Sequence, residues 1–351
     1  MPPVVWSDVV LQHQPGAEIW VGVRTPGTEL PARALVLRDA VVAAGAQLVP
    51  ASAYDDAVLR SVHDAGLLDH LSTVADEWAA GPYEELVGQD RVVPYVFPTA
   101  AMLDGLPAHA PSATHARAGV YCYDTMTLVG PGTWPASRAA VDVALTAADL
   151  VADGARAAYA LVRPPGHHAT RRGFGGSCYL NNAAVAAQRL RDRGAARVAV
   201  ADIDAHHGNG TQAIFYDRAD VTYGSVHVDP GAGWFPHFVG FGDETGAGAG
   251  TGATCNRPVS PGTGDAGWLD ALDTVLGHAT AARPEALVVS LGVDAAGGDP
   301  ESPLEVSTEG FAAAGERLVG LGLPTVLVHE GGYDLDRLGR DTVAVLSAFR
   351  G

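Results

Sequence analysis

The sequence predicts an α/β protein whose central sheet is mostly parallel and is covered by helices on both faces. Three observations predict it. Apolar, β-prone runs recur in the second half of the chain, each run passes into a polar loop, and Ala/Leu-rich helical patterns lie between them. Near-continuous apolar strands that alternate with helices are typical of a sheet buried on both sides. The four runs are Tyr159–Arg163, Val198–Asp204, Ala286–Leu291 and Thr325–His329.

The helical patterns have start and stop signals at several of their ends. They are, in chain order, Leu30–Ala46, Tyr54–His70, Trp134–Asp153, Asn182–Arg193, Trp268–Arg283 and Thr308–Gly320. Gly154 and Gly194 are stop signals, and Ser307 is a suitable N-cap for the last helix. Between about residues 79 and 120 the chain is rich in Gly and Pro. A loop this long in a compact domain is usually functional or disordered. No boundary is clean enough to separate a second domain, so we expect one domain over 1–351 with an insertion loop there.

Composition and charge exclude several classes of protein. The chain has 351 residues, and its 22 basic and 40 acidic side chains give a net charge of −18. A nucleic-acid-binding protein needs a positive face, so this balance fits solubility or a cationic partner instead. No apolar run approaches the ~20 residues of a membrane span. The start MPPVVWSDVVLQ has no secretory pattern and the three cysteines form no CxxC pair, so we expect a cytoplasmic protein.

The stretch DIDAHHG suggests a metal centre. On an extended strand Asp202, Asp204 and His206 would point to one side, because they are two residues apart. Asp294 follows another predicted strand, and parallel strands present their carboxyl ends at one edge of the sheet. Asp204, His206 and Asp294 together make one nitrogen and two oxygen donors, a set typical of catalytic zinc. Any one of these aspartates alone is more often a helix cap.

The stretches RPPGHHA and EGGYD add acid–base groups. Hydrolysis of an amide needs a base for water and an acid for the leaving amine, and His167 and His168 are held side by side after a rigid turn. Tyr333 follows Gly331 and Gly332, which permit close backbone approach, so its phenol is placed to donate to an oxyanion. The alternatives are a packed histidine and an ordinary half-buried tyrosine.

These stretches resemble the histone deacetylase superfamily, and most of all its bacterial acetylpolyamine amidohydrolase branch. The matching segments occur in family order: RPPGHHA, GGSCYLNNAAVAAQRL, DIDAHHGNGTQAIFY, FPHFVGFGDETGAGAGTGAT, VVSLGVDAAGGDP and HEGGYD. The resemblance implies the arginase/deacetylase-like three-layer α/β/α fold. It also implies zinc-dependent hydrolysis of an N-acetyl amide to acetate and a free amine, with a small acetylated amine such as an acetylpolyamine as substrate.

The resemblance also implies a role for individual residues. Asp204, His206 and Asp294 match the zinc ligands, with Fe²⁺ as the alternative metal. His168 matches the general base, His167 its partner oriented by Asp202, and Tyr333 the tyrosine that polarises the carbonyl. Asn209 stands where some members place an aspartate behind the second histidine. The residues that match a structural potassium site, mostly through backbone carbonyls, are Asp202, Asp204, His206, Ser225 and Val226.

The substrate tunnel departs from the family pattern. Its matching residues are Gly176, Ser177, Phe235, Gly331 and Gly332, and Ser177 stands where an aromatic residue is expected. Acidic residues that meet distal ammonium groups in polyamine-type members are replaced by His115 and Met126, which leaves Asp90, Asp104, Asp124 and Glu244 as substitutes. The insertion loop resembles the one by which such enzymes form homodimers and narrow their entrance.

The sequence lacks the motifs of two other classes of hydrolase. An arginase-like binuclear manganese site needs a further aspartate after Asp204-Ala205-His206, where the chain has His207, Gly208 and Asn209. No GxSxG elbow is present for a serine hydrolase. Three readings remain: an acetyl-lysine deacetylase, a deacetylase of a biosynthetic intermediate, and a metal-loaded module that binds an acyl ligand without turnover. Mere binding does not require all of His167, His168 and Tyr333.

Overall fold

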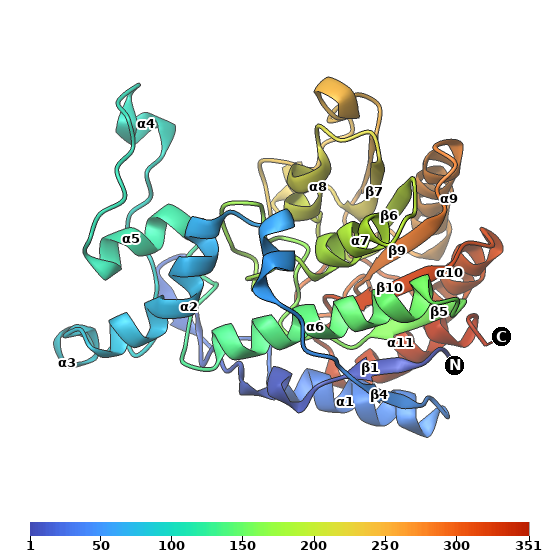
Figure 1. The fold of residues 1–351 in the computed structure, drawn as a ribbon, viewed down its shortest axis with the longest axis horizontal. Helices are drawn as coiled ribbons and strands as arrows, with labels where there is room; N and C mark the ends of the chain where they lie inside the picture. The colour runs from blue at the N-terminus through green and yellow to red at the C-terminus, as the bar shows by residue number, and fades with distance from the viewer. Residues whose placement is uncertain (351) are drawn as a thin grey trace.

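The structure, a computed structural model that describes residues 1–350, contains one eight-stranded sheet in which all neighbouring strands are parallel. The strand order is β4-β1-β5-β10-β9-β6-β7-β8 (Figure 1). The bounds are β1 Val4–Trp6, β4 Leu48–Pro50, β5 Ala157–Ala160, β6 Val198–Asp202, β7 Val221–Val228, β8 Thr254–Val259, β9 Ala286–Leu291 and β10 Thr325–His329. Two further strands, β2 (Glu18–Trp20) and β3 (Val23–Thr25), form a separate antiparallel hairpin.

Helices cover both faces of the sheet, which confirms the predicted three-layer α/β/α architecture. One face packs against α1 (Pro31–Ala43), α9 (Asp265–Ala281), α10 (Thr308–Gly320) and α11 (Leu335–Ser347). The other packs against α6 (Thr133–Ala152), α7 (Asn182–Asp192) and α8 (Asn209–Phe215), and α2 (Ala65–Ala79) contributes side chains to the same core. The short 3₁₀ helices are η1 Asp8–Gln12, η2 Asp56–Ser61, η3 Pro230–Ala232 and η4 Gly248–Gly250.

Each central strand contributes alternate residues to two separate cores. In β9, Ala286 and Val288 belong to the core under α6 and α7, whereas Leu287, Val289 and Leu291 belong to the core under α9 and α10. All six residues of β9 are buried. This is why the strands read as continuous apolar runs in the sequence and not as an alternation of apolar and polar residues.

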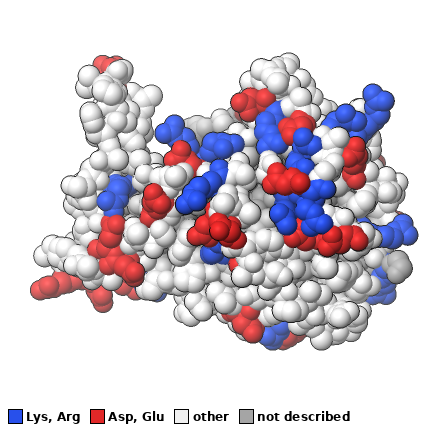
Figure 2. Space-filling view, in the orientation of Figure 1, with Lys and Arg blue, Asp and Glu red and all other residues white. Residues whose placement is uncertain are grey.

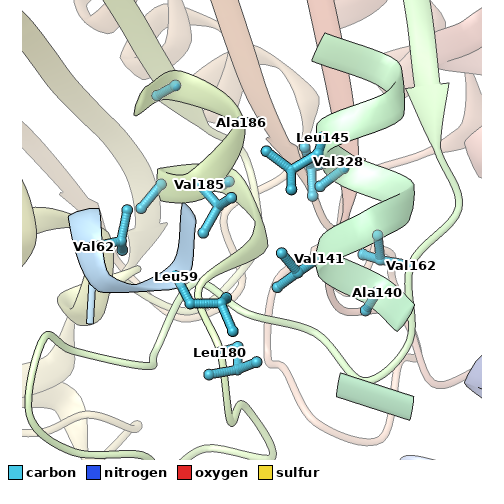
Figure 3. Packing of buried hydrophobic residues seen from close by; sticks show 14 of the residues in the cluster. Leu59, Val62, Ala140, Val141, Leu145, Val162, Leu180, Val185, Ala186 and Val328 are labelled. Atoms are coloured by element: carbon cyan, nitrogen blue, oxygen red, sulfur yellow. The ribbon is translucent and has the colours of Figure 1, made fainter. Parts of the chain in front are cut away.

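The first core is closed by aliphatic side chains from distant parts of the chain. Figure 3 shows Val141 and Leu145 of α6 directed towards Val328 of β10, and Val185 of α7 beside Val62, which follows η2. Each of these five side chains is at most 1% exposed. Burying an aliphatic side chain of this size stabilises the fold by roughly 1.5–3 kcal/mol relative to exposure.

The predicted helices Leu30–Ala46 and Trp134–Asp153 correspond to α1 and α6, and the helices predicted in the second half also match. The prediction of one helix over Tyr54–His70 is wrong: η2 ends at Ser61, and α2 begins at Ala65 after Asp64. The Asp64 carboxylate accepts a hydrogen bond from the Gly66 N–H at 2.9 Å, so it is the N-cap of a new helix. The strand predicted to reach Asp204 ends at Asp202, and the chain turns there.

The insertion between residues 79 and 120 carries three short helices: α3 (Tyr83–Val87), α4 (Ala100–Leu103) and α5 (Thr114–Tyr121). Figure 1 shows α4 at the end of an arm that extends away from the sheet. Several large apolar side chains of the insertion are 63–74% exposed. They are Leu86, Val87, Tyr95, Met102 and Leu106.

The surface over α6 and α7 mixes both signs of charge (Figure 2). Arg189 and Arg193 both contact Asp149, at 2.8 and 2.6 Å, and Arg191 contacts Asp220 at 2.7 Å. These arginines are therefore paired and do not form a free basic patch for phosphates. Within residues 1–350, no helix combines the length and the apolar character that crossing a bilayer demands.

Candidate active site

The candidate residues lie on loops that leave the carboxyl ends of neighbouring strands. His167 and His168 follow β5, Asp204 and His206 follow β6, and Asp294 follows β9. Tyr333 follows β10, which lies between β5 and β9 in the sheet. Open parallel sheets build their ligand sites at this edge, so the strand order brings together residues that are far apart in the sequence.

Asp204, His206 and Asp294 converge on one point. One ligand atom from each lies within 4.8 Å of the others, and His206 Nδ1 is 3.3 Å from Asp204 Oδ1 and 3.1 Å from Asp294 Oδ2. We expected Asp204 and His206 to point to one side because alternate residues of an extended strand do so. That reason is wrong, since the strand ends at Asp202. The turn after Asp202 orients Asp204 and His206, with the His206 N–H donating to Asp204 Oδ1 at 2.9 Å.

The donor set fits a divalent cation. Both carboxylates are fully buried, and within the described chain neither forms an ion pair with an arginine. Burial and the neighbouring Asp204 raise the pKa of Asp294 to about 7, which is the cost of placing two carboxylates together without a metal. A Cβ on Gly331 would lie 2.2 Å from Asp294 Oδ2, so the backbone encloses these oxygens closely.

His168 presents a neutral imidazole to the site. Its Nδ1 donates to Asn209 Oδ1 at 2.7 Å, which leaves Nε2 with a free lone pair. The Tyr123 hydroxyl donates to the His168 carbonyl at 2.7 Å, and the Asn209 amide donates to that hydroxyl at 3.4 Å. Burial, with help from the neighbouring His167 and His206, lowers the pKa of His168 well below its usual value.

His167 has the opposite electrostatic setting. Its ring centroid is 4.0 Å from that of His168, but its Nδ1 lies 3.1 Å from Asp202 Oδ2. Burial opposes its charge, and Asp204 and Asp202 outweigh burial and raise the pKa of His167 to about 10. A cation bound to Asp204 would offset the effect of that carboxylate on the pKa of His167. Asp202 would then remain the charged partner of His167. The two adjacent histidines therefore have unequal affinities for a proton.

Tyr333 is held from both sides. The Arg33 guanidinium lies 4.5 Å from the centre of its ring, and the Tyr333 N–H donates to Asp299 Oδ2 at 2.8 Å. Arg33 also donates to the Gly332 and Glu330 carbonyls at 2.6 and 2.7 Å. Burial raises the pKa of Tyr333 well above its usual value, so the phenol stays a hydrogen-bond donor.

A cavity of about 680 Å³ opens in front of these groups. His168, His206 and Tyr333 line it together with Ser177 and Phe235. It extends from His168, which is 4% exposed, to the β2–β3 hairpin, where Trp20 and Val21 are 62% and 79% exposed. The reactive groups thus lie at the buried end of a cleft that is open to solvent.

The predicted tunnel residues separate into two groups. Gly176, Ser177 and Phe235 line the cavity, and the Phe235 ring packs edge-on to His168 with centroids 4.7 Å apart. Gly331 and Gly332 do not line the cavity. The Gly331 N–H donates to Asp204 Oδ2 at 2.7 Å, and the Gly332 carbonyl accepts from Arg33.

The residues of the expected potassium site are neighbours in the sheet. Asp202 of β6 pairs with Ser225 of β7, and Val226 follows in the same strand. The Ser225 hydroxyl bonds to His227 Nδ1 at 2.8 Å. Asp202, Ser225 and Val226 are all buried.

None of the four acidic residues suggested for a distal ammonium group lines the cavity. Asp124 accepts hydrogen bonds from the backbone of Met126, Thr127 and Gly176. Glu244 is engaged with Gln212 and the Gly240 N–H, and Asp90 pairs with Arg91 and Arg24. Asp104 is the C-cap of α4 on the arm.

Sequence reasoning missed four residues that support the site. Glu330 accepts from the Gly166 and His167 N–H groups at 2.6 and 3.1 Å, and Asp299 fixes Tyr333. Both lie in motifs that the sequence marked. Tyr123 and Arg33 carried no signal, because they reach the site from the N-terminal part of the chain.

The chain is similar to known proteins over nearly its whole length. The histone deacetylase domain matches residues 28–349. An acetylpolyamine amidohydrolase of Mycoplana ramosa is 41% identical over 350 residues, which is 99% of each chain. Acetylpolyamine amidohydrolase 1 of Pseudomonas aeruginosa is 40% identical over 99% of this chain and 98% of its own. The crystal structure of acetylpolyamine aminohydrolase from Burkholderia pseudomallei superposes with a TM-score of 0.92 at 39% identity, covering 99% and 98% of the two chains.

Proposed function

The chain belongs to the histone deacetylase family, and we propose that it hydrolyses small acetylated amines, acetylpolyamines above all, to acetate and the free amine. Its family and relatives make it a deacetylase-type amidohydrolase. The observation that carries the proposal is the convergence of His168, His206 and Tyr333 on the buried end of one cavity. Similarity to acetylpolyamine amidohydrolases over nearly the full chain supports the substrate class.

Asp204, His206 and Asp294 would hold the metal, for which we propose zinc with Fe²⁺ as the alternative. When bound, the cation supplies Lewis-acid polarisation of the amide carbonyl and makes water more acidic. We further propose a structural potassium at Asp202, Ser225 and Val226, held mainly by backbone carbonyls.

The side chains of this protein would then move the protons. His168 accepts a proton from the attacking water at Nε2, because Asn209 holds the proton of its Nδ1. Tyr333 donates a hydrogen bond to the oxyanion that develops from the carbonyl oxygen. The imidazole pair then returns a proton to the leaving nitrogen, and His167 stays oriented by Asp202. The C–N bond breaks and yields acetate and the amine.

The test compares two substrates. Acetate release from N-acetylputrescine and from a fluorogenic acetyl-lysine amide is measured on apo-protein and after addition of one equivalent of zinc. Turnover of the first, dependent on metal, is expected. Turnover of the second alone would move the assignment to lysine deacetylation, and no turnover of either by metal-loaded protein would favour the binding module.

We also propose that the enzyme is a cytoplasmic homodimer. The exposed apolar side chains of the insertion support the dimer, since exposed apolar surface usually marks contact sites. The three cysteines are unpaired, which fits a reducing compartment. The assembly is measured by light scattering on the full chain and on a variant with Leu86→Glu and Leu106→Glu. A dimer that persists in the variant would show that these side chains of the insertion do not form the contact.

A further inference from the structure

Three hydrogen bonds join the main chain of His168 to its own imidazole ring. The Tyr123 hydroxyl donates to the His168 carbonyl at 2.7 Å, and Asn209 Nδ2 donates to that hydroxyl at 3.4 Å. Asn209 Oδ1 then accepts from His168 Nδ1 at 2.7 Å. The chain of hydrogen bonds thus begins and ends on the residue that acts as the proposed general base.

The first link fixes the direction of this chain. A backbone carbonyl can only accept, so the Tyr123 hydroxyl commits its proton to the His168 carbonyl and offers a lone pair to Asn209. The Asn209 amide therefore turns its NH₂ group towards Tyr123 and its oxygen towards the imidazole. Rotation of the amide would exchange these two groups, and its oxygen would then face the lone pairs of the hydroxyl oxygen. That arrangement is unfavourable because neither oxygen has a proton to donate.

The orientation of the amide decides which nitrogen of His168 carries the proton. In a neutral imidazole, the hydrogen bond made by one nitrogen determines which of the two is protonated. An oxygen at Nδ1 keeps the proton there and leaves the lone pair on Nε2, the nitrogen that the proposed reaction uses. An NH₂ group at Nδ1 would favour the other tautomer, whose Nε2 is already protonated. That imidazole could not accept a proton from the attacking water.

Tyr123 and Asn209 reach His168 from outside the reactive cavity. Within residues 1–350, neither of them lines that cavity, and both line a neighbouring groove of about 510 Å³. The Tyr123 ring is held independently of its hydroxyl. It stacks on Phe235 with ring centroids 6.4 Å apart, and it packs so closely on Gly175 that a Cβ there would overlap it. Burial raises the pKa of Tyr123 well above its usual value, so the hydroxyl remains a donor.

We propose that Tyr123 is a positioning residue for the general base and that it acts by fixing the orientation of the Asn209 amide. This inference rests on the proposed deacetylase function and adds a residue to its proton transfer. Tyr123 selects the tautomer in which His168 can accept a proton. The two ends of an amide differ, so Asn209 must be oriented, whereas a carboxylate offers an acceptor at both oxygens. The requirement for Tyr123 therefore follows from the amide at position 209.

The experiment removes the Tyr123 hydroxyl in two backgrounds. The values of kcat and KM for N-acetylputrescine are measured on the zinc-loaded parent, on Tyr123→Phe, on Asn209→Asp and on the double variant. Phenylalanine retains the ring and its packing on Phe235, and aspartate removes the dependence on orientation. Tyr216→Phe removes a hydroxyl outside both cavities and is the matched control. Zinc content and the unfolding midpoint are measured for every protein.

We expect Tyr123→Phe to lower kcat about fivefold in the parent background, which is the population shift that one neutral hydrogen bond supports. KM should stay constant, because Tyr123 does not line the reactive cavity. In the Asn209→Asp background the same substitution should change kcat by less than about twofold, since either carboxylate oxygen accepts from Nδ1. Equal losses in both backgrounds would show that Tyr123 supports only the main chain of His168. Such a result, or an unchanged kcat in the parent background, would overturn the proposal.

A second measurement does not depend on turnover. The ¹⁵N NMR spectrum of histidine-labelled protein distinguishes the two tautomers, because protonated and unprotonated ring nitrogens differ in chemical shift, and comparison with His168→Gln assigns the signals. His168 should be protonated at Nδ1 in the parent, and Tyr123→Phe should move most of its population to the Nε2 tautomer. An unchanged tautomer in Tyr123→Phe would contradict the proposal. If the zinc-loaded parent hydrolyses neither N-acetylputrescine nor the acetyl-lysine amide, the deacetylase function is refuted, and the tautomer measurement still decides the role of Tyr123.

Discussion

Replacing Tyr333 by phenylalanine isolates the contribution of one hydroxyl group. Within residues 1–350 this hydroxyl has no hydrogen-bond partner, whereas the ring packs on Arg33 at 4.5 Å and the backbone N–H is bound by Asp299. Phenylalanine keeps both contacts. We therefore expect the free energy of unfolding to stay nearly constant and the catalytic rate alone to change.

The magnitude follows from the state of the phenol. Because burial keeps Tyr333 protonated, the substitution removes a neutral donor at the place where the oxyanion develops. Loss of one such donor costs about 2.7–4 kcal/mol, or about 10²–10³ in kcat. Metal binding should be unaffected, since Tyr333 is not one of the three converging ligands.

The assay is kcat for N-acetylputrescine, with metal content per chain and the unfolding midpoint measured on the same samples. Tyr216→Phe, which removes a hydroxyl outside the cavity, is the control and should behave as the parent. A kcat for Tyr333→Phe within about threefold of the parent would show that the phenol does not stabilise the transition state, and the catalytic scheme would lose its electrophilic partner.

Three further expectations concern the metal, the acyl group and pH. Asp294→Asn keeps the acceptor for the Ala205 N–H but removes an anionic ligand, so zinc affinity should fall about 100-fold or more; stoichiometric metal after dialysis would contradict this. Ser177→Phe should narrow the cavity and lower the hexanoyl-to-acetyl rate ratio, and an unchanged ratio would place the acyl wall elsewhere. His63 is buried, which lowers its pKa to about 4. The unfolded state thus binds more protons between pH 6.5 and 4, and stability should fall by roughly 2 kcal/mol from pH 7 to 5. His63→Gln should flatten that dependence of the unfolding midpoint, and an identical slope would assign it to other groups.

Local patterns in the sequence were sufficient to predict the architecture. The runs Ala286–Leu291 and Thr325–His329 are strands with the expected bounds, because a strand buried on both faces must be apolar throughout. The ends of Tyr54–His70 were not predictable in the same way. The break between η2 and α2 depends on the N-cap that Asp64 provides. The sequence pattern over Tyr54–His70 also fits one continuous helix, so it does not reveal the break.

Local motifs were enough to identify the reactive groups: DIDAHHG, RPPGHHA and EGGYD hold the donors, the imidazoles and the phenol. The acidic residues that line the cavity, in contrast, became evident only from the fold. Glu18 lies in an N-terminal hairpin and Glu301 lies 283 positions later (301 − 18), and no local pattern relates them. Their proximity to the cavity arises from the order of the strands and from how the hairpin packs. Long-range packing, which linear spacing does not encode, thus brings these two carboxylates to one cavity.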